Sequence, residues 1–422
     1  MHILTKLVFA VSFSLVSFAP LCAQDVPPET SQPADTAQQG ERIVDHRPTG
    51  YFLKRALHPF TWIDDGVFRP AYGLGTGSLA DKIMEFRGRP PGPVKFGVGG
   101  AGPDSGFGPV ITPHHTFFGH ALDVQIPLLY TYKGYQDYEI NLRMPAATSY
   151  FFVNARYLDR PEDKFFGIGN DTPLGNETFV QTVRREADAG YSAGINKHLR
   201  ANIGIGFEWV GVTKPAFGDS AQSFFAPGEV PGLFTGASLR SITLSIDHDT
   251  QDDPHRATRG GMESAEAGLY ESIGSGDFAF WKYRLNIQRY FSISRDQRKV
   301  IAFRGMFETN QKKGGSQVPF FEMPYVGSWE TLRGFESYRY RDNSAVAIGL
   351  EYRYRIWRDL DWGLFVDRGQ VAPQPGDFAW NQLHTGYGVR LFVFPAPKLP
   401  ITVDLGRSNE KLRLYVNFNP SF

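Results

Sequence analysis

The 422-residue chain has a single cysteine, no excess of charge of either sign and few long apolar runs. One cysteine, Cys22, excludes both an intramolecular disulfide and a multi-thiolate metal site. Because 44 basic residues balance 44 acidic ones, the sequence has no basic footprint for nucleic acid, and we expect no nucleic-acid partner. No uninterrupted stretch of about 18 apolar residues follows the amino-terminal segment, which argues against membrane-spanning helices.

The first 23 residues have the organisation of a secretory signal peptide. Lys6 precedes an apolar run from Leu7 to Ala19, and small residues near Ala23 suit cleavage. The run is too short to cross a bilayer as a helix. We therefore expect export of the chain and cleavage after Ala23, which would also remove Cys22.

The strongest pattern is an alternation of apolar and polar residues with a period of two, which is typical of β-strands. From 344 to 357, one face carries Val346, Ile348, Leu350, Tyr352, Tyr354 and Ile356. The opposite face carries Ala345, Ala347, Gly349, Glu351, Arg353 and Arg355. In a soluble sandwich the charged face would meet bulk water, whereas in a membrane barrel it lines a wet lumen and the apolar face meets lipid.

The length of these strands and the repeated arginines on one face favour the barrel. Closure also removes the strand edges, whose backbone groups lipid cannot satisfy. We predict an all-β fold, an antiparallel transmembrane β-barrel over 94–422 with sixteen strands, and fourteen as the alternative. The predicted strands are 94–101, 107–117, 121–132, 135–144, 148–158, 183–196, 198–213, 239–249, 262–273, 279–293, 299–311, 344–357, 361–371, 384–394, 399–406 and 411–420.

Two segments precede the predicted barrel. Residues 24–50 are rich in Pro, Gln, Thr and Asp and indicate a flexible linker. Residues 51–93 are predicted to form a short segment that caps the barrel mouth. Leu53 and Leu57 share a possible helical face, and Pro59 limits that helix or kinks it.

A short motif stands in the long loop between the strands predicted at 299–311 and 344–357. It consists of Leu332, Arg333, Gly334 and Phe335. A partner motif in a later strand consists of Phe365, Asp367 and Gly369. Alternation places Asp367 on the polar face of its strand, so we predict that it pairs with Arg333. Glu351, on the preceding strand, is a competing partner.

These features resemble the BamA/TamA and two-partner-secretion superfamily of outer-membrane barrels, also called the bacterial surface antigen family. The matching features are the motifs at 332–335 and 365–369, an aspartate, proline and glycine pattern from Asp249 to Gly260, and the terminal Phe422. The resemblance implies that the loop folds back into the lumen and that Arg333 pairs with Asp367 there. It also implies a tight backbone at Gly334 and packing of Phe335 against the wall.

The resemblance further implies that Phe418 and Phe422 form a carboxyl-terminal assembly signal. The expected partners are outer-membrane lipids, the barrel-assembly machinery during biogenesis, and client polypeptides. The POTRA repeats through which relatives receive clients are missing from the sequence, so the chain resembles the short members of the family. The expected location is the bacterial outer membrane.

Two functions stay open from the sequence. The first is outer-membrane protein assembly, insertion or polypeptide translocation; the alternative is a pore or lipid-handling barrel without a protein client. We expect no enzyme, no cofactor and no metal site. Residues 97–102 match a dinucleotide fingerprint by letter but lack the following helix, and residues 190–194 match a nucleophile elbow but lie inside an alternating strand.

Overall fold

The computed structural model describes residues 94–274, 276–396 and 399–418. All of them belong to the second of two compact units, which spans Ile63–Phe422. The signal peptide, linker and capping segment expected over 1–93 lie outside the described residues. No helix in the described part of the chain is long and apolar enough to cross a membrane.

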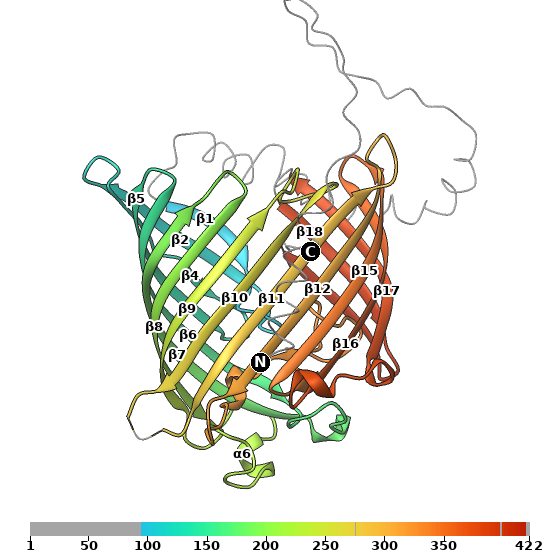
Figure 1. Cartoon of the computed structure of the whole chain (residues 1–422). Coiled ribbons are helices and arrows are strands. Elements are labelled where there is room, and N and C mark those ends of the chain that lie inside the picture. The colour runs from blue at the N-terminus through green and yellow to red at the C-terminus, as the bar shows by residue number, and fades with distance from the viewer. Residues whose placement is uncertain (1–93, 275, 397–398, 419–422) are drawn as a thin grey trace, which may run out of the picture. The chain divides into compact units, whose positions relative to one another are not determined.

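One large antiparallel sheet curls around to form the barrel wall (Figure 1). Its strands are β1 (Val94–Gly99), β2 (Gly108–Phe117), β3 (Leu122–Gln125), β4 (Leu128–Tyr130), β5 (Gln136–Ala146), β6 (Ser149–Phe165), β7 (Thr178–Gly194), β8 (Leu199–Thr213), β9 (Ala237–Asp249), β10 (Gly260–Ser272), β11 (Ala279–Ser292), β12 (Lys299–Lys312), β15 (Ser344–Trp357), β16 (Leu360–Ala372), β17 (His384–Ala396), β18 (Leu399–Arg407) and β19 (Leu412–Phe418).

These seventeen strands fill sixteen positions around the wall. The short strands β3 and β4 both pair with β2 and with β5, so they are two halves of one interrupted strand. The interruption lies at Ile126 and Pro127, where proline cannot donate a ladder hydrogen bond. The predicted barrel of sixteen antiparallel strands is confirmed.

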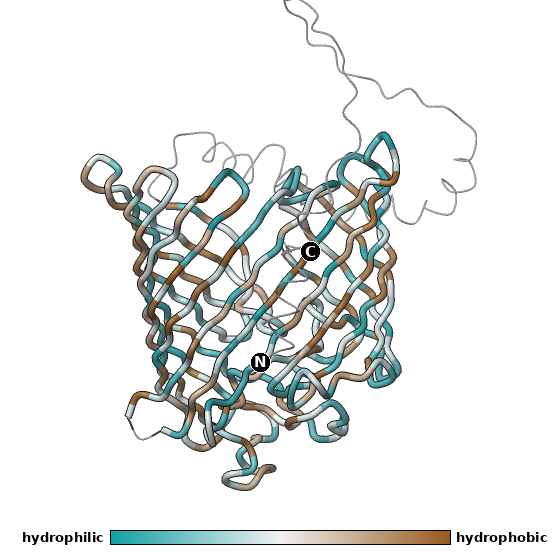
Figure 2. The backbone as a smooth tube through the Cα atoms, viewed as in Figure 1, coloured by the Kyte–Doolittle hydropathy of each residue, from teal (hydrophilic) through white to brown (hydrophobic). Residues whose placement is uncertain are grey.

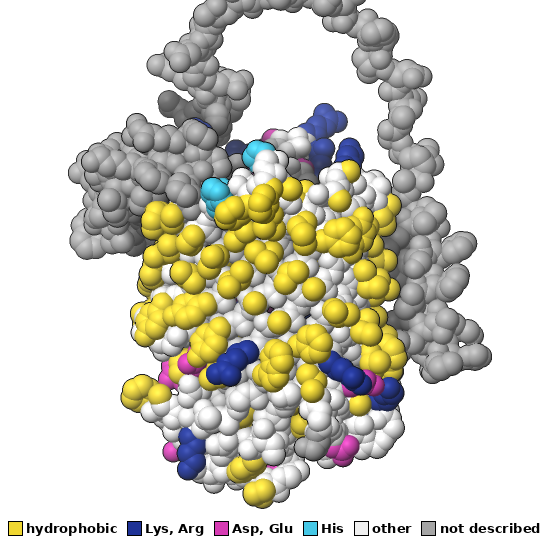
Figure 3. Space-filling view, turned by 90° about the vertical axis from the view of Figure 1, so that its left-hand side faces the viewer, with side chains coloured by type: hydrophobic (Ala, Val, Ile, Leu, Met, Phe, Trp, Pro, Cys, Tyr) yellow, Lys and Arg dark blue, Asp and Glu magenta, His cyan; other side chains and the backbone are white. Residues whose placement is uncertain are grey.

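Hydrophilic and hydrophobic residues alternate along the wall strands, as the pattern predicts (Figure 2). Leu350 and Leu364 expose 48% of their surface on the outside, whereas Glu351 and Asp367 are fully buried on the inside. A band of hydrophobic side chains covers the outer wall, and charged side chains appear along one border of it (Figure 3). An apolar exterior around a polar interior is the arrangement expected of a barrel that meets lipid.

Strands β6 and β7 extend further than the sequence indicated. The sequence predicted that the first would end at 158 and the second would begin at 183, but they reach Phe165 and begin at Thr178. The register between them shifts between Arg160 and Asp163. Pro161 lies within this irregularity, and a bulge is one of the few places where a strand accepts proline. The bulge hid the second half of the strand from a period-two pattern.

Connections at one end of the barrel are longer than those at the other. The end with the longer connections includes 100–107, 131–135, 166–177, 214–236, 313–343, 373–383 and 408–411. Short helical turns in these connections are η2 (Leu174–Asn176), α6 (Ala221–Phe224), η4 (Pro375–Asp377) and η5 (Trp380–Gln382). The opposite end has the connections 118–121, 147–148, 195–198, 250–259, 293–298 and 358–359.

The connection 313–343, between β12 and β15, folds inward and is called the lumen loop below. It contains η3 (Phe320–Glu322) and a small hairpin of β13 (Tyr325–Val326) with β14 (Tyr340–Arg341). Every residue from 331 to 345 is buried. Loops of this length normally lie on the surface, so the burial shows that the lumen loop is part of the core.

Candidate functional site: the lumen loop and its wall contacts

Arg333, in the motif of the lumen loop, is fully buried against the inner wall. Its Nε and Nη2 atoms donate to the two carboxylate oxygens of Asp367 at 2.7 and 2.9 Å. Its Nη1 atom donates to Glu351 at 2.7 Å. Arg333 therefore binds both acidic residues that the sequence offered as alternative partners. The two-pronged contact with Asp367 is the strong, orientation-specific form of the arginine and carboxylate pair.

Asp367 also holds the backbone of the loop, because the Arg333 amide donates to its Oδ2 atom at 3.2 Å. The Arg333 guanidinium carbon lies 3.5 Å from the centre of the Phe365 ring, which gives it an aromatic face to stack on. Burial by itself lowers the pKa of Arg333, but the nearby Asp367 and Glu351 carboxylates raise it above the usual value. The arginine is therefore charged at every physiological pH.

Four more charged side chains extend this contact into a network. They are Arg304 on β12, Arg353 on β15, Arg390 on β17 and Asp404 on β18, with ion-pair distances of 3.0 Å (Arg304 to Asp367), 2.6 Å (Arg353 to Glu351), 3.4 Å (Arg390 to Glu351) and 2.5 Å (Arg390 to Asp404). Together with Arg333, Glu351 and Asp367, the network holds four guanidinium groups and three carboxylates. One positive charge is in excess, so the carboxylates are the scarcer partners.

The backbone of the loop tip is held by the last wall strand, β19, and by the connection that precedes it. The Tyr415 hydroxyl accepts from the Gly334 amide at 3.1 Å and donates to the Phe335 carbonyl at 2.7 Å. The Ser408 hydroxyl donates to the Gly334 carbonyl at 2.7 Å. Gly334 has φ +95°, and a side chain there would also meet the Arg407 backbone at 2.8 Å. Both the conformation and the space require glycine at this position.

A glycine on the wall makes room for the same tip. A Cβ atom on Gly386 of β17 would lie 1.8 Å from the Arg333 carbonyl oxygen. No side chain fits there without moving the loop. The wall and the tip are thus in direct backbone contact.

Apolar side chains of the tip pack between the hairpin and the wall. Leu332 and Phe335 are fully buried in one cluster. The other members are Val326, Tyr340, Ala345, Ala347 and Val371. Gly369 of the partner motif lies under this cluster, where an added Cβ would meet Val326 at 3.5 Å. The side chain of Phe418 and the whole of Phe422, proposed from the sequence as an assembly signal, lie outside the described residues.

The residue after the motif touches two distant parts of the wall. Glu336 accepts from Lys164 of β6 at 2.5 Å and from Lys411, just before β19, at 3.4 Å, and it forms an ion pair with Arg413 of β19. Nearby, Arg160 of β6 donates to the Tyr338 hydroxyl. The lumen loop therefore binds both β6, in the first half of the wall, and β19, its last strand.

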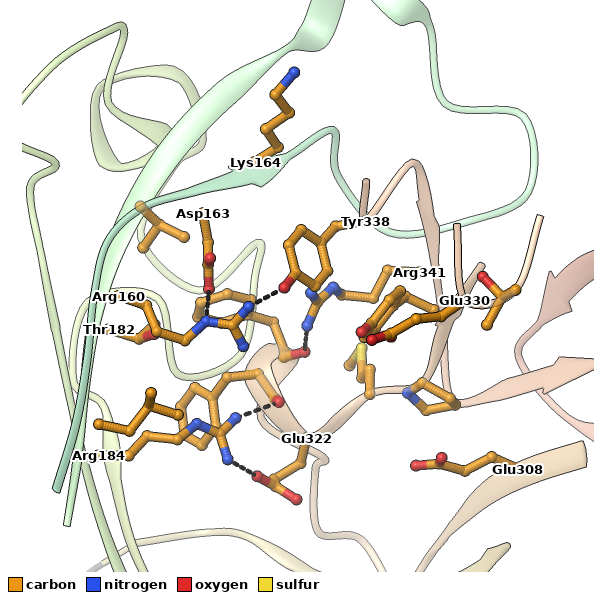
Figure 4. A pocket seen from close by; sticks show the side chains of 18 of the residues that line it. Arg160, Asp163, Lys164, Thr182, Arg184, Glu308, Glu322, Glu330, Tyr338 and Arg341 are labelled. Carbon is orange, nitrogen blue, oxygen red and sulfur yellow. Dashed lines mark hydrogen bonds and ion pairs between the residues drawn. The ribbon is translucent and has the colours of Figure 1, made fainter. Parts of the chain in front are cut away.

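A third contact lies at η3, on the opposite side of the lumen. Glu322 accepts from Arg184 of β7 at 2.9 Å and from Lys282 of β11 at 2.6 Å (Figure 4 shows the contact with Arg184). Burial alone raises the pKa of Glu322, but these two cations lower it below the usual value. The loop is thus fixed to the wall on several sides by charge-assisted bonds.

Sequence reasoning did not identify several of these contact residues as partners of the loop. Arg304, Arg390 and Asp404 carry the right alternation for an inner face, so the pattern could place them in the lumen. It could not choose their partners, because the pairing depends on how far each strand is shifted against the next. Tyr415 and Ser408 gave no signal that separates them from other strand and turn residues.

The sequence motifs that match enzymes by letter lie in ordinary strands and turns of the described residues. No group of three or more His, Cys, Asp or Glu side chains among them could hold a metal ion. Ser192, in the nucleophile-elbow match, lies within β7 and donates to Asn202 at 2.6 Å. The dinucleotide match at 97–102 runs from β1 into a turn and then into β2. What the site can do is hold the lumen loop in one position.

Comparison with known proteins gave one family and several similar structures. The model of the Omp85 superfamily domain matches residues 117–417. BamA from Haemophilus ducreyi lacking POTRA domains 1-3 is 13% identical with a TM-score of 0.59, covering 77% of this chain and 70% of that chain. CdiB from Escherichia coli is 12% identical with a TM-score of 0.52, covering 78% of this chain and 62% of that chain. At such identities, these two structures show a shared fold.

Proposed function

Because the chain belongs to the Omp85 superfamily, we propose that it is an outer-membrane barrel that inserts or translocates other polypeptides. The likeness to BamA and CdiB supports a role in protein assembly or translocation by analogy of fold. The role needs no catalytic residue, because it consists of opening and closing a path along or through the wall. The cleavable signal expected over 1–23 would direct export, and the apolar band would meet the membrane lipids.

The observation that carries the proposal is that the lumen loop is bound both to β6, in the first half of the wall, and to the last strand, β19. Registers join each wall strand to the next from β1 to β19, and none among the described residues joins β19 to β1. We call this junction the seam. A seam that parted would expose two strand edges, which are templates for pairing with another strand, and a client strand would bind there.

The lumen loop couples that seam to the charged network. On one side of the seam, β6 is the fifth wall position, and its Lys164 and Arg160 bind Glu336 and Tyr338. On the other side, Tyr415 of β19 binds the loop tip. Displacing the loop would release both groups of strands together. A second, displaced position of the loop is what a gated insertion or translocation path would require.

The loop also argues against a permanently open pore. Its residues from 331 to 345 are buried, and they contact wall strands from β6 to β19. A solute channel would need this loop to move before the lumen could conduct. The alternative function, a pore or lipid-handling barrel without a protein client, also requires the lumen loop to move. Unlike insertion of a client, it does not require the seam to open.

Depletion of the protein in its own cell separates these functions. We expect a defined set of outer-membrane or secreted proteins to fall in abundance, and the wild-type chain to restore them. A Glu336→Gln variant, expressed at the wild-type level in the membrane, should restore them only partly, whereas Arg240→Gln, on the exposed outer wall, should restore them fully. A normal membrane proteome with lost solute uptake would support the pore instead, and no change in either would refute both.

A further inference from the structure

A cavity of about 520 Å³ lies between the lumen loop and the inner faces of β6, β7, β11 and β12 (Figure 4). Since a water molecule takes about 30 Å³ in the liquid, the cavity has room for a small ion together with its water. Seven cationic side chains line it, namely Arg156, Arg160, Lys164, Arg184, Lys282, Arg284 and Arg341. Their partners determine whether the cavity holds free positive charge.

Six of the seven cations already have a carboxylate partner. The pairs are Arg156 with Asp137 (2.7 Å), Arg160 with Asp163 (3.0 Å), Lys164 with Glu336 (2.5 Å), Arg184 with Glu208 (2.7 Å), Lys282 with Glu322 (2.6 Å) and Arg284 with Glu308 (2.9 Å). Across the described residues, no carboxylate lies within 4.0 Å of the Arg341 guanidinium nitrogens. Arg341 is therefore the exception in a lining whose other cations are neutralised.

Arg341 is also buried, with 7% of its surface exposed. Its Nη1 atom donates to the Phe320 carbonyl at 2.7 Å, and its Nε atom has no hydrogen-bond partner in the described part of the chain. The rings of Phe320, Tyr325 and Tyr338 have their centres 5.5 to 5.7 Å from its guanidinium carbon. Aromatic faces tolerate a cation but do not neutralise it.

The contrast with Arg333, on the same loop, shows what Arg341 lacks. Two carboxylates at 2.7 Å raise the pKa of Arg333. Burial lowers the pKa of Arg341 to about 10, because the charges of Tyr325 and Asp163 only partly oppose it. A buried guanidinium without a counterion is costly, and a bound anion would remove that cost.

We propose that this cavity is a binding site for a small oxyanion, either phosphate or a carboxylate, with Arg341 as its principal ligand. A guanidinium presents a planar fork of donors that matches the oxygens of such anions. Arg160 and the Tyr338 hydroxyl lie beside Arg341 (Figure 4) and narrow the space around its guanidinium group. The five acidic side chains of the lining, Asp163, Glu186, Glu308, Glu322 and Glu330, favour an anion of low charge.

The test measures thermal unfolding of the purified full-length chain in detergent with added sodium phosphate, sodium acetate or sodium chloride at equal ionic strength. A ligand of the folded state raises the melting temperature with its concentration, whereas screening acts alike for all three salts. We expect a saturable rise with phosphate or acetate beyond that with chloride, and calorimetric titration of the same two anions identifies which one binds.

Variants assign the binding to Arg341. Arg341→Gln should lower the affinity for the anion at least tenfold. Arg341→Lys keeps the charge and should lower the affinity less. It also serves as the test variant if Arg341→Gln does not fold. Arg156→Gln is the matched control, because it removes a paired cation from the same lining, and it should change affinity less than threefold. Absence of saturable binding, unchanged binding in Arg341→Gln, or equal loss in Arg156→Gln would each overturn the proposal. The proposed anion site is independent of the proposed function. If depletion of the protein left the membrane proteome unchanged, the binding measurements would keep their meaning.

Discussion

Substitutions at the two ends of the main ion pair should have unequal effects on stability. We compare Asp367→Asn with Arg333→Met, since both replacements remove a charge and keep most of the side-chain volume. The network has four guanidinium groups and three carboxylates. Removing Asp367 leaves two positive charges in excess, whereas removing Arg333 leaves none.

The expected magnitudes follow from the partners that remain. Without Asp367, Arg333 keeps its ion pair with Glu351, and Arg304 loses an ion pair at 3.0 Å while keeping its hydrogen bonds to loop carbonyls. Without Arg333, Asp367 keeps Arg304, and Glu351 keeps Arg353 at 2.6 Å. Removing one partner of a buried ion pair costs about 3–5 kcal/mol, so we expect Asp367→Asn to lower the free energy of unfolding by about 4 kcal/mol. Arg333→Met removes hydrogen bonds, but the two carboxylates keep other partners. We therefore expect it to lower the free energy of unfolding by about 2 kcal/mol.

The assay is unfolding by guanidinium chloride in detergent, followed by tryptophan fluorescence, with the resistance of the folded band to heating in SDS as a second measure. The double variant should lose about as much free energy of unfolding as Asp367→Asn alone, because the two residues share one interaction. Arg240→Met, which removes an outward arginine with an exposed side chain, should leave unfolding unchanged. Equal costs for the two single variants, or a double variant that shows their sum, would refute the charge-excess reasoning.

Two further substitutions test the backbone contacts of the loop tip. Gly386→Ala places a Cβ atom 1.8 Å from the Arg333 carbonyl oxygen, so it should displace the tip and increase both protease cleavage of the loop and ion conductance. Gly376→Ala, where an added Cβ meets nothing within 4 Å, should change neither. Tyr415→Phe removes two hydrogen bonds to the tip and should cost about 1–2 kcal/mol in the same unfolding assay; Tyr387→Phe on the exposed outer face should cost none.

Most of the fold could be predicted from the sequence because lipid and water impose a strict alternation on barrel strands. The sixteen predicted strands correspond to the sixteen wall positions, including the interrupted pair β3 and β4. The errors occur where that alternation fails. Pro161 in the bulge of β6 hid seven further residues of that strand from 159 to 165, and the start of β7 was missed opposite it.

The site was only partly accessible from the sequence. Alternation put Asp367 and Glu351 on the inner face, and a lone loop arginine needed an acidic partner. The sequence favoured Asp367 over the competing Glu351 as the partner of Arg333, and in the structure Arg333 binds both. Alternation also fixes which residues of each strand face the lumen, but it says nothing about which of them meet across it.

By itself, the sequence determined that the chain forms a barrel with an apolar exterior and a charged interior, because that contrast is local and repeats every second residue. It also indicated the loop motif, because an arginine between two strong strands is conspicuous. Only the tertiary structure decided that four arginines share three carboxylates, that Tyr415 holds the loop tip, and that Arg341 alone among seven lining cations lacks a carboxylate in the described residues. These facts depend on distances between side chains far apart in the chain, and such distances follow from strand register and barrel closure.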